Sequence, residues 1–184
     1  MKTSVFFKVY RIFLFNKMSL SGVLIFSISI LLSCNILSSC KIKPAMQNVE
    51  VYPFRLKPGE DLKKSIDNFV REHQIKAGWV STCAGSLTNY NIRFANQPNS
   101  SGGTGHFEIL SLSGTVSTNG SHLHISISDS TGKTIGGHLS EGCTVYTTAE
   151  IVICTANNFI FKREKDGTTP WDELKIQEIN KKGI

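Results

Sequence analysis

The protein has 184 residues and a formal net charge of +6, with 20 Lys and Arg against 14 Asp and Glu. Four of the basic residues and none of the acidic ones fall within residues 1–40, so the rest of the chain is close to neutral. That balance disfavours a nucleic-acid protein that relies on a basic surface, and the remaining length suits one domain rather than two.

Residues 1–40 have the pattern of an export signal of the lipoprotein type. Basic residues precede an apolar stretch at 20–32, which is shorter than the roughly 18 to 20 residues that span a bilayer. Leu-Ser-Ser-Cys ends at Cys40 and Leu-Leu-Ser-Cys ends at Cys34, and both resemble the bacterial lipobox. We therefore expect an exported protein anchored to a bacterial membrane, on the periplasmic or outer-surface side, by a lipid on Cys40 or, alternatively, Cys34. An uncleaved anchor is the other interpretation.

The first elements of the predicted domain are a strand and a helix. Residues 41–48 are expected to be a tether, and the segment 49–56 alternates as a strand does. Pro58-Gly59 opens a predicted helix, whose apolar positions fall on one stripe: Leu62, Ile66, Phe69 and Val70.

From Ala77 onward the pattern is that of β-strands. A turn is predicted at 85–89 and an exposed loop at 97–105, because both are rich in Gly, Ser and Asn. Asn119-Gly120 predicts a tight hairpin between two alternating runs, and a second turn is expected at 130–134.

The chain closes with a long apolar run at 143–156 and a short one at 159–161. We expect a single α+β domain over residues 49–175, followed by a C-terminal tail at 176–184. The three cysteines of this part have no CxxC spacing and are odd in number, which favours buried free thiols: Cys83, Cys143 and Cys154.

Three of the five histidines cluster in the sequence. His122 and His124 are spaced HxH, so in a strand they share one face, and His138 returns after a glycine-containing turn. Three neutral imidazoles are a common ligand set for zinc and leave one tetrahedral position open. Asp129 and Glu141 are candidate partners for the imidazoles, or a general base if the site is catalytic.

Two other interpretations fit the same residues. The HxH pair also fits the solvent face of an amphipathic strand, with Leu123 and its alternating neighbours pointing inward. A cupin-like metal set would use the HxH pair with Asp129 and Gly136, although the second cupin histidine motif does not follow. No Walker lysine pattern, GxGxxG spacing or GxSxG elbow occurs.

From about Val51 to Leu174 the chain resembles the PPC domain, the plants-and-prokaryotes conserved domain. The order of several motifs carries this resemblance. They are Ala84-Gly85-Ser86-Leu87, Phe107-Glu108-Ile109-Leu110-Ser111-Leu112-Ser113-Gly114-Thr115, His122-Leu123-His124, Gly136-Gly137-His138-Leu139 with Gly142, Ala149-Glu150-Ile151-Val152, and the tail positions Phe161, Arg163 and Leu174.

The resemblance implies a curved, mainly antiparallel sheet with one main helix packed on it, and a homotrimer. It also implies zinc at His122, His124 and His138, with a site inside one chain or at a subunit boundary. Glu150 is carried over as a family position, expected to be buried. The family is often labelled DNA-binding, but in plant members the contact comes from an Arg-Gly-Arg-Pro segment, which this chain lacks.

We therefore expect a trimeric, lipid-anchored binding module with a three-histidine zinc site and without DNA binding. Its small-molecule ligand does not follow from the sequence. The alternative is a metal-dependent enzyme, cupin-like or hydrolytic, that uses the same histidines.

Overall fold

The computed structural model describes residues 49–179. The expected export signal, both lipidation candidates and the tether lie outside these residues. Within them the order of elements is β1 (Val51–Leu56), α3 (Leu62–Glu72), β2 (Gly78–Arg93), β3 (Ser101–Ser117), β4 (Gly120–Ser128), β5 (Thr134–Leu139), β6 (Thr144–Thr155), β7 (Phe159–Glu164) and β8 (Glu173–Glu178). The fold is α+β and mostly antiparallel, as predicted.

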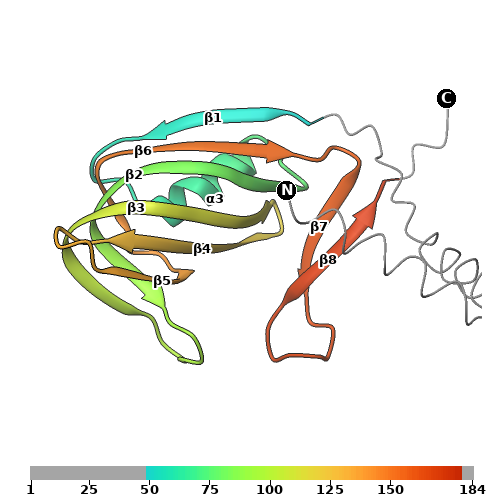
Figure 1. The fold of residues 1–184 in the computed structure, drawn as a ribbon. Helices are drawn as coiled ribbons and strands as arrows, with labels where there is room; N and C mark the ends of the chain where they lie inside the picture. Colours follow the sequence, from blue (N-terminus) through green and yellow to red (C-terminus); the bar gives the residue numbers. More distant parts are fainter. Residues whose placement is uncertain (1–48, 180–184) are drawn as a thin grey trace, which may run out of the picture. The chain divides into compact units, whose positions relative to one another are not determined.

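Strands β1 to β6 form one sheet in the order β1-β6-β2-β3-β4-β5 (Figure 1). The sheet curls so far that β5 also pairs with the end of β2, where Ile92 faces Leu139 and Arg93 faces His138. Strands β2 to β5 therefore close on themselves, and the end of β5 lies between the end of β2 and the middle of β4, where His138 is opposite His124.

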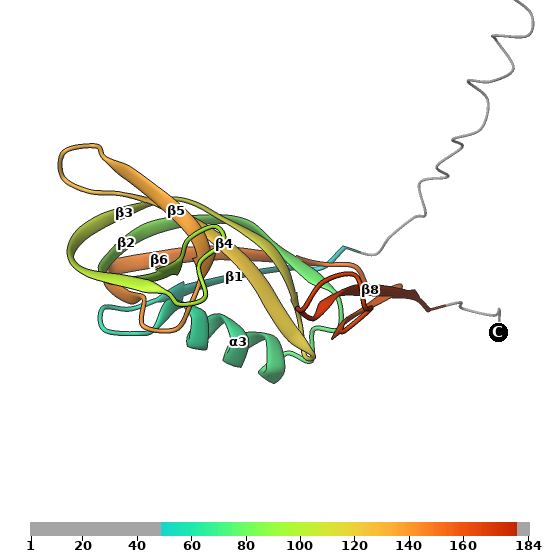
Figure 2. The same cartoon turned by 90° about the horizontal axis from the view of Figure 1, so that it is seen from below.

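One helix covers a face of this sheet (Figure 2). Asp61 caps its first turn by accepting a hydrogen bond from the Lys64 backbone N–H at 3.0 Å. The predicted apolar stripe is confirmed: Leu62, Ile66 and Val70 are buried against the sheet. Phe69, at the edge of the stripe, stacks on Phe54 of β1 with ring centroids 3.9 Å apart.

The side chains that face the helix form the core. Strand β4 contributes Leu123, Ile125 and Ile127, all buried, so its alternate residues point outward. Strand β6 buries Val145, Ala149, Ile151 and Ile153 in the same way, as its apolar run predicts. The outward-facing half of β4 is therefore free to carry polar function.

Two loop predictions were wrong. The segment 85–89 is not a turn, because β2 continues through it with bulges that shift its register against β3 and β6. The predicted loop at 97–105 is shorter, because β3 begins at Ser101 and its glycines pair with β2. Small residues are common both in β-bulges and in turns, so the composition of a segment alone does not distinguish a bulge from a turn.

Strands β7 and β8 form a separate two-stranded ribbon beside the six-stranded sheet (Figure 1). The ribbon crosses the domain boundary expected at residue 175, since β8 runs to Glu178. In the part of the chain that the structure describes, no helix has the length and apolarity to cross a bilayer.

Candidate metal centre

Strand pairing assembles the three histidines. His122 and His124 lie on the outer face of β4, opposite Thr115 and Ser113 of β3. The turn at 130–134 returns the chain as β5, and in this register His138 lies directly opposite His124. The predicted convergence of the three imidazoles is therefore present within one chain.

The three side chains are close enough to share one ion. One ligand nitrogen from each lies within 4.8 Å of the other two. The Nε2 atoms of His122 and His124 are 3.1 Å apart, while nitrogen ligands of a tetrahedral zinc ion are about 3.3 Å apart. His124 is exposed, and His122 and His138 are half-buried.

The environment of the imidazoles suits a metal. The Nδ1 atom of His138 is buried and has no hydrogen-bond partner within residues 49–179, and a metal bound through this atom would use its lone pair. Burial, followed by the charges of His122 and Arg93, lowers the pKa of His138 to about 4. Burial, followed by the charge of Arg163, lowers the pKa of His122. Both rings are neutral at pH 7, the form that binds metal.

An arginine from the ribbon lies over the cluster. The Arg163 guanidinium donates through Nη2 to Thr115 Oγ1 at 2.5 Å and through Nη1 to His122 Nδ1 at 3.5 Å. Its backbone N–H donates to Asn119 Oδ1 at 2.6 Å, which ties β7 to the β3–β4 hairpin. Arg163 is therefore held in place from both ends.

Two open pockets flank His122. One, of about 360 Å³, lies on the side of His124 and Thr115. The other, of about 450 Å³, lies on the side of His138, where Arg93 stacks 5.1 Å from the ring of Trp171. Arg163 and Glu173 line both pockets. The cluster is accessible to a small ligand from either side.

The acidic partners expected from the sequence are elsewhere. Asp129 lies in the β4–β5 turn, where its Oδ1 accepts hydrogen bonds from the Thr131 and Lys133 backbone N–H groups. It is therefore neither a metal ligand of a cupin-like set nor a general base at the histidine cluster. Glu141 is exposed and its Oε2 lies 3.3 Å from Lys64 Nζ. Glu150 is exposed rather than buried, because its position on β6 faces outward.

The three cysteines of the described residues are free thiols, as expected, but only Cys83 and Cys143 are buried, and Cys154 is half-buried. Burial raises the pKa of Cys83 to about 12 and that of Cys143 to about 11. Both thiols are therefore protonated near neutral pH in the metal-free protein.

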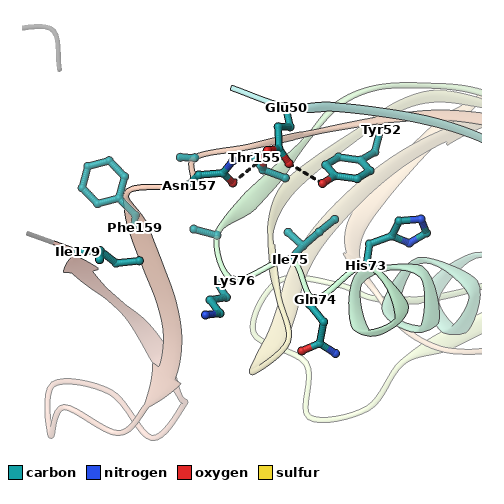
Figure 3. A pocket seen from close by; sticks show the side chains of 12 residues that line it. Glu50, Tyr52, His73, Gln74, Ile75, Lys76, Thr155, Asn157, Phe159 and Ile179 are labelled. Atoms are coloured by element: carbon teal, nitrogen blue, oxygen red, sulfur yellow. Dashed lines mark hydrogen bonds between the residues drawn. The ribbon is translucent and has the colours of Figure 1, made fainter. Parts of the chain in front are cut away.

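A further pocket, of about 320 Å³, lies between the end of α3 and the ribbon, where His73 lines it, and includes none of the three clustered histidines (Figure 3). There Glu50 accepts hydrogen bonds from the Tyr52 hydroxyl at 2.6 Å and from Asn157 Nδ2 at 2.7 Å. These bonds tie the start of β1 to the end of β6, which gives the residues a structural role.

A family model, that of the Plants and Prokaryotes Conserved (PCC) domain, matches residues 44–157, more than half of the chain. The protein belongs to the PCC domain family. This is the family that the sequence motifs resemble. The match includes all three histidines and ends before the β7–β8 ribbon, so Arg163 and Glu173 lie outside it.

Known proteins similar to this PCC protein differ in length. It is 41% identical over 132 residues to the bifunctional protein GlmU of Synechococcus sp. (strain JA-3-3Ab), covering 72% of this chain and 21% of the relative. The chain therefore spans about a fifth of that curated relative.

Two solved structures match this chain over nearly their whole length. A hypothetical protein from Salmonella is 38% identical, with a TM-score of 0.71, covering 73% of this chain and 97% of the other. A metal-containing protein from Archaeoglobus fulgidus is 25% identical, with a TM-score of 0.60, covering 68% and 93%.

The sequence indicated the histidines of this PCC protein but not the residues around them. Arg93, Thr115 and Glu173 belong to three different strands and have no spacing in common with the HxH motif. Thr115 and Arg163 had a signal, because both belong to motifs that resemble the family, but that signal gave neither residue a role.

Proposed function

We propose that this protein is a metal-binding module in which His122, His124 and His138 hold one zinc ion. The observation that carries the proposal is the approach of three ligand nitrogens to within 4.8 Å of one another on a half-buried surface. The unpartnered His138 Nδ1 supports it, because a buried polar atom without a partner costs free energy that coordination would recover.

Zinc is the favoured ion because neutral imidazole suits it and a three-histidine set is a known zinc arrangement. The similarity to a metal-containing protein of Archaeoglobus fulgidus supports metal binding in the fold. When bound, zinc would supply a Lewis acid with an open position. The chain's own residues orient the ligands: β4 fixes the HxH pair, and β5 brings the third ring.

We favour a binding module over an enzyme because neither expected general base lies at the cluster. The alternative, a metal-dependent hydrolase, draws on one specific observation: the carboxylate of Glu173 lines both pockets beside His122. Hydrolysis of a p-nitrophenyl ester by the zinc-loaded protein, lost in Glu173→Gln while zinc is retained, would favour the enzyme.

Location and assembly are further parts of the proposal. The basic, apolar and cysteine-ended leader supports export and a lipid anchor on Cys40 or Cys34. The family resemblance supports a homotrimer. Near-neutral charge outside the leader gives little attraction to the phosphate backbone of DNA, so we do not expect DNA binding.

The test is a calorimetric titration of zinc into the metal-stripped domain 46–184, which forms one compact unit. We expect one ion per chain in the wild type, and at least about a hundredfold weaker binding in His124→Ala. His106→Ala is the matched control, because this exposed histidine on β3 stacks on Tyr146 outside the cluster. Equal zinc affinity in all three proteins would contradict the proposal.

A further inference from the structure

We infer that the centre takes an oxyanion, the carboxylate or phosphate group of a small molecule, held jointly by the metal and the Arg163 guanidinium. The inference rests on the proposed metal site and adds a ligand class and a residue to it. Arg163 stands on β7, beyond the part of the chain that matches the family model.

The first argument is the balance of charge. Three neutral imidazoles leave a bound dication uncompensated, and Arg163 adds a further positive charge beside it. Arg163 is half-buried, and among residues 49–179 no carboxylate lies within ion-pair distance of it; the charge of Glu173 acts on it from farther away. A partly desolvated cation without an ion-pair contact is costly, so an anion that contacts both charges is favoured.

The second argument is the hydrogen-bonding capacity of Arg163. The guanidinium carries five N–H donors, of which the described contacts use one to Thr115 and a long one to His122. The backbone bond to Asn119 and the Thr115 contact fix its position, so the remaining donors are preorganised toward the two pockets that it lines. A planar donor group of this kind suits a carboxylate or a phosphate.

The third argument concerns the proton on His122. A metal on Nε2 of this ring requires the proton on Nδ1, the atom that accepts from Arg163 Nη1 at 3.5 Å. Guanidinium has no acceptor, so two donors would then face each other. Metal binding would therefore release Nη1 from His122 and make it available to a ligand of the same metal.

The space around the site limits the size of this ligand. The pockets of about 360 and about 450 Å³ are large enough for a small organic acid or phosphate ester. Two acidic residues oppose an anion at the rim: Glu173, whose Oε1 accepts from Thr169 Oγ1, and Asp172. Removing the Glu173 charge should therefore strengthen anion binding, the opposite of removing Arg163.

The experiment loads the domain 46–184 with Co²⁺ and titrates it with inorganic phosphate and, separately, acetate. The visible absorption of Co²⁺ reports a new ligand at its open position, and calorimetry gives the affinity. We expect binding of at least one probe to weaken about tenfold or more in Arg163→Met. It should weaken less in Arg163→Lys, strengthen a few-fold in Glu173→Gln, and stay unchanged in Arg55→Met, a remote exposed arginine on β1.

Three results would overturn the inference. Cobalt that loads normally while both anions bind Arg163→Met as tightly as wild type would remove Arg163 from the ligand site and leave the metal site standing. Equal anion affinity with and without cobalt would show that the metal takes no part. A chain that loads no cobalt would remove the proposed function as well.

Discussion

His138 lies directly opposite His124 in the β4–β5 pair, so strand register places the third imidazole beside the HxH face. A slip of one residue in either strand would turn one partner to the other face of the sheet. The geometry of the centre therefore depends on the backbone that holds β4 in register, and substitutions there should affect metal binding without touching an imidazole.

Gly114→Ala is the sharpest such substitution. Gly114 pairs with Leu123, between the two β4 histidines, and has φ +140. A Cβ here would lie 1.9 Å from the His122 backbone oxygen, so the β3–β4 pairing must shift. We expect a loss of about 3 kcal/mol or more in the free energy of unfolding, together with weaker zinc binding. Urea unfolding and zinc calorimetry measure the two.

The control is Gly132→Ala in the β4–β5 turn. Gly132 also has a positive φ, but a Cβ there meets nothing within 4 Å. We expect only about 1 to 2 kcal/mol of destabilisation, with zinc affinity unchanged. A Gly114→Ala protein as stable as Gly132→Ala would contradict the register argument.

Arg163→Met should bind zinc more tightly than the wild type. The substitution removes a positive charge beside His122 and the donor that opposes a proton on His122 Nδ1. A half-exposed site has an effective dielectric constant between those of water and of the protein interior. We therefore expect the free energy of zinc binding to improve by about 1 kcal/mol, which corresponds to about fivefold in affinity. Competition with a chromophoric chelator measures it, and Arg163→Lys, which keeps the charge, should show a smaller gain. Weaker zinc binding in Arg163→Met would refute this prediction.

The metal-free domain should lose stability as the pH falls from about 6.5 to about 4. In the unfolded chain His138 titrates near its ordinary pKa, whereas burial lowers its folded pKa to about 4. Between these values the unfolded state takes up a proton that the folded state does not, and below pH 4 this contribution is complete. Because the ring is half-exposed, solvent screening limits the loss to about 1 to 2 kcal/mol.

Urea unfolding of the metal-free domain over this pH range is the measurement. His138→Asn removes the titration, so its free energy of unfolding should fall less steeply between pH 6.5 and 4 than that of the wild type. Identical slopes for the two proteins would show that His138 does not titrate as its burial implies.

Asp61→Ala should destabilise the domain without affecting the metal. Asp61 caps α3 through Lys64 N–H, and its Oδ2 accepts from the Gly142 backbone N–H at 2.6 Å, which links the helix to the β5–β6 connection. We expect a loss of about 2 kcal/mol, at the upper end for a cap because two donors lose their acceptor. In thermal unfolding Asp61→Asn should lose less than half as much; an unchanged melting temperature for Asp61→Ala would rule out this role.

Much of the fold was predictable because its patterns are local. The apolar stripe of α3, the Asn119-Gly120 hairpin and the alternation of β4 each follow from neighbours in sequence. The bulges of β2 were not predictable, since small residues at 85–89 fit a turn as well, and only pairing on both sides of the strand keeps it continuous.

The candidate site also contains some residues that follow from local sequence and others that depend on tertiary packing. The HxH pair and the hairpin return of His138 are local, so the sequence predicted them correctly. Asp129 and Glu141 are near in sequence but lie at turns, where backbone and lysine partners occupy them. Arg163 lies on the β7–β8 ribbon, which follows the six-stranded sheet in the sequence. Its approach to His122 depends on tertiary packing and not on the sequence spacing between the two residues.

The most direct test of the metal centre is the metal content of the domain 46–184, purified without added metal, beside His122→Ala and His138→Ala. Native mass spectrometry of the same samples records the number of chains and of ions together. We predict about one zinc per chain in the wild type and none in either variant, with all three proteins folded. A folded wild-type protein that carries no metal and gains none on exposure to zinc would contradict the account.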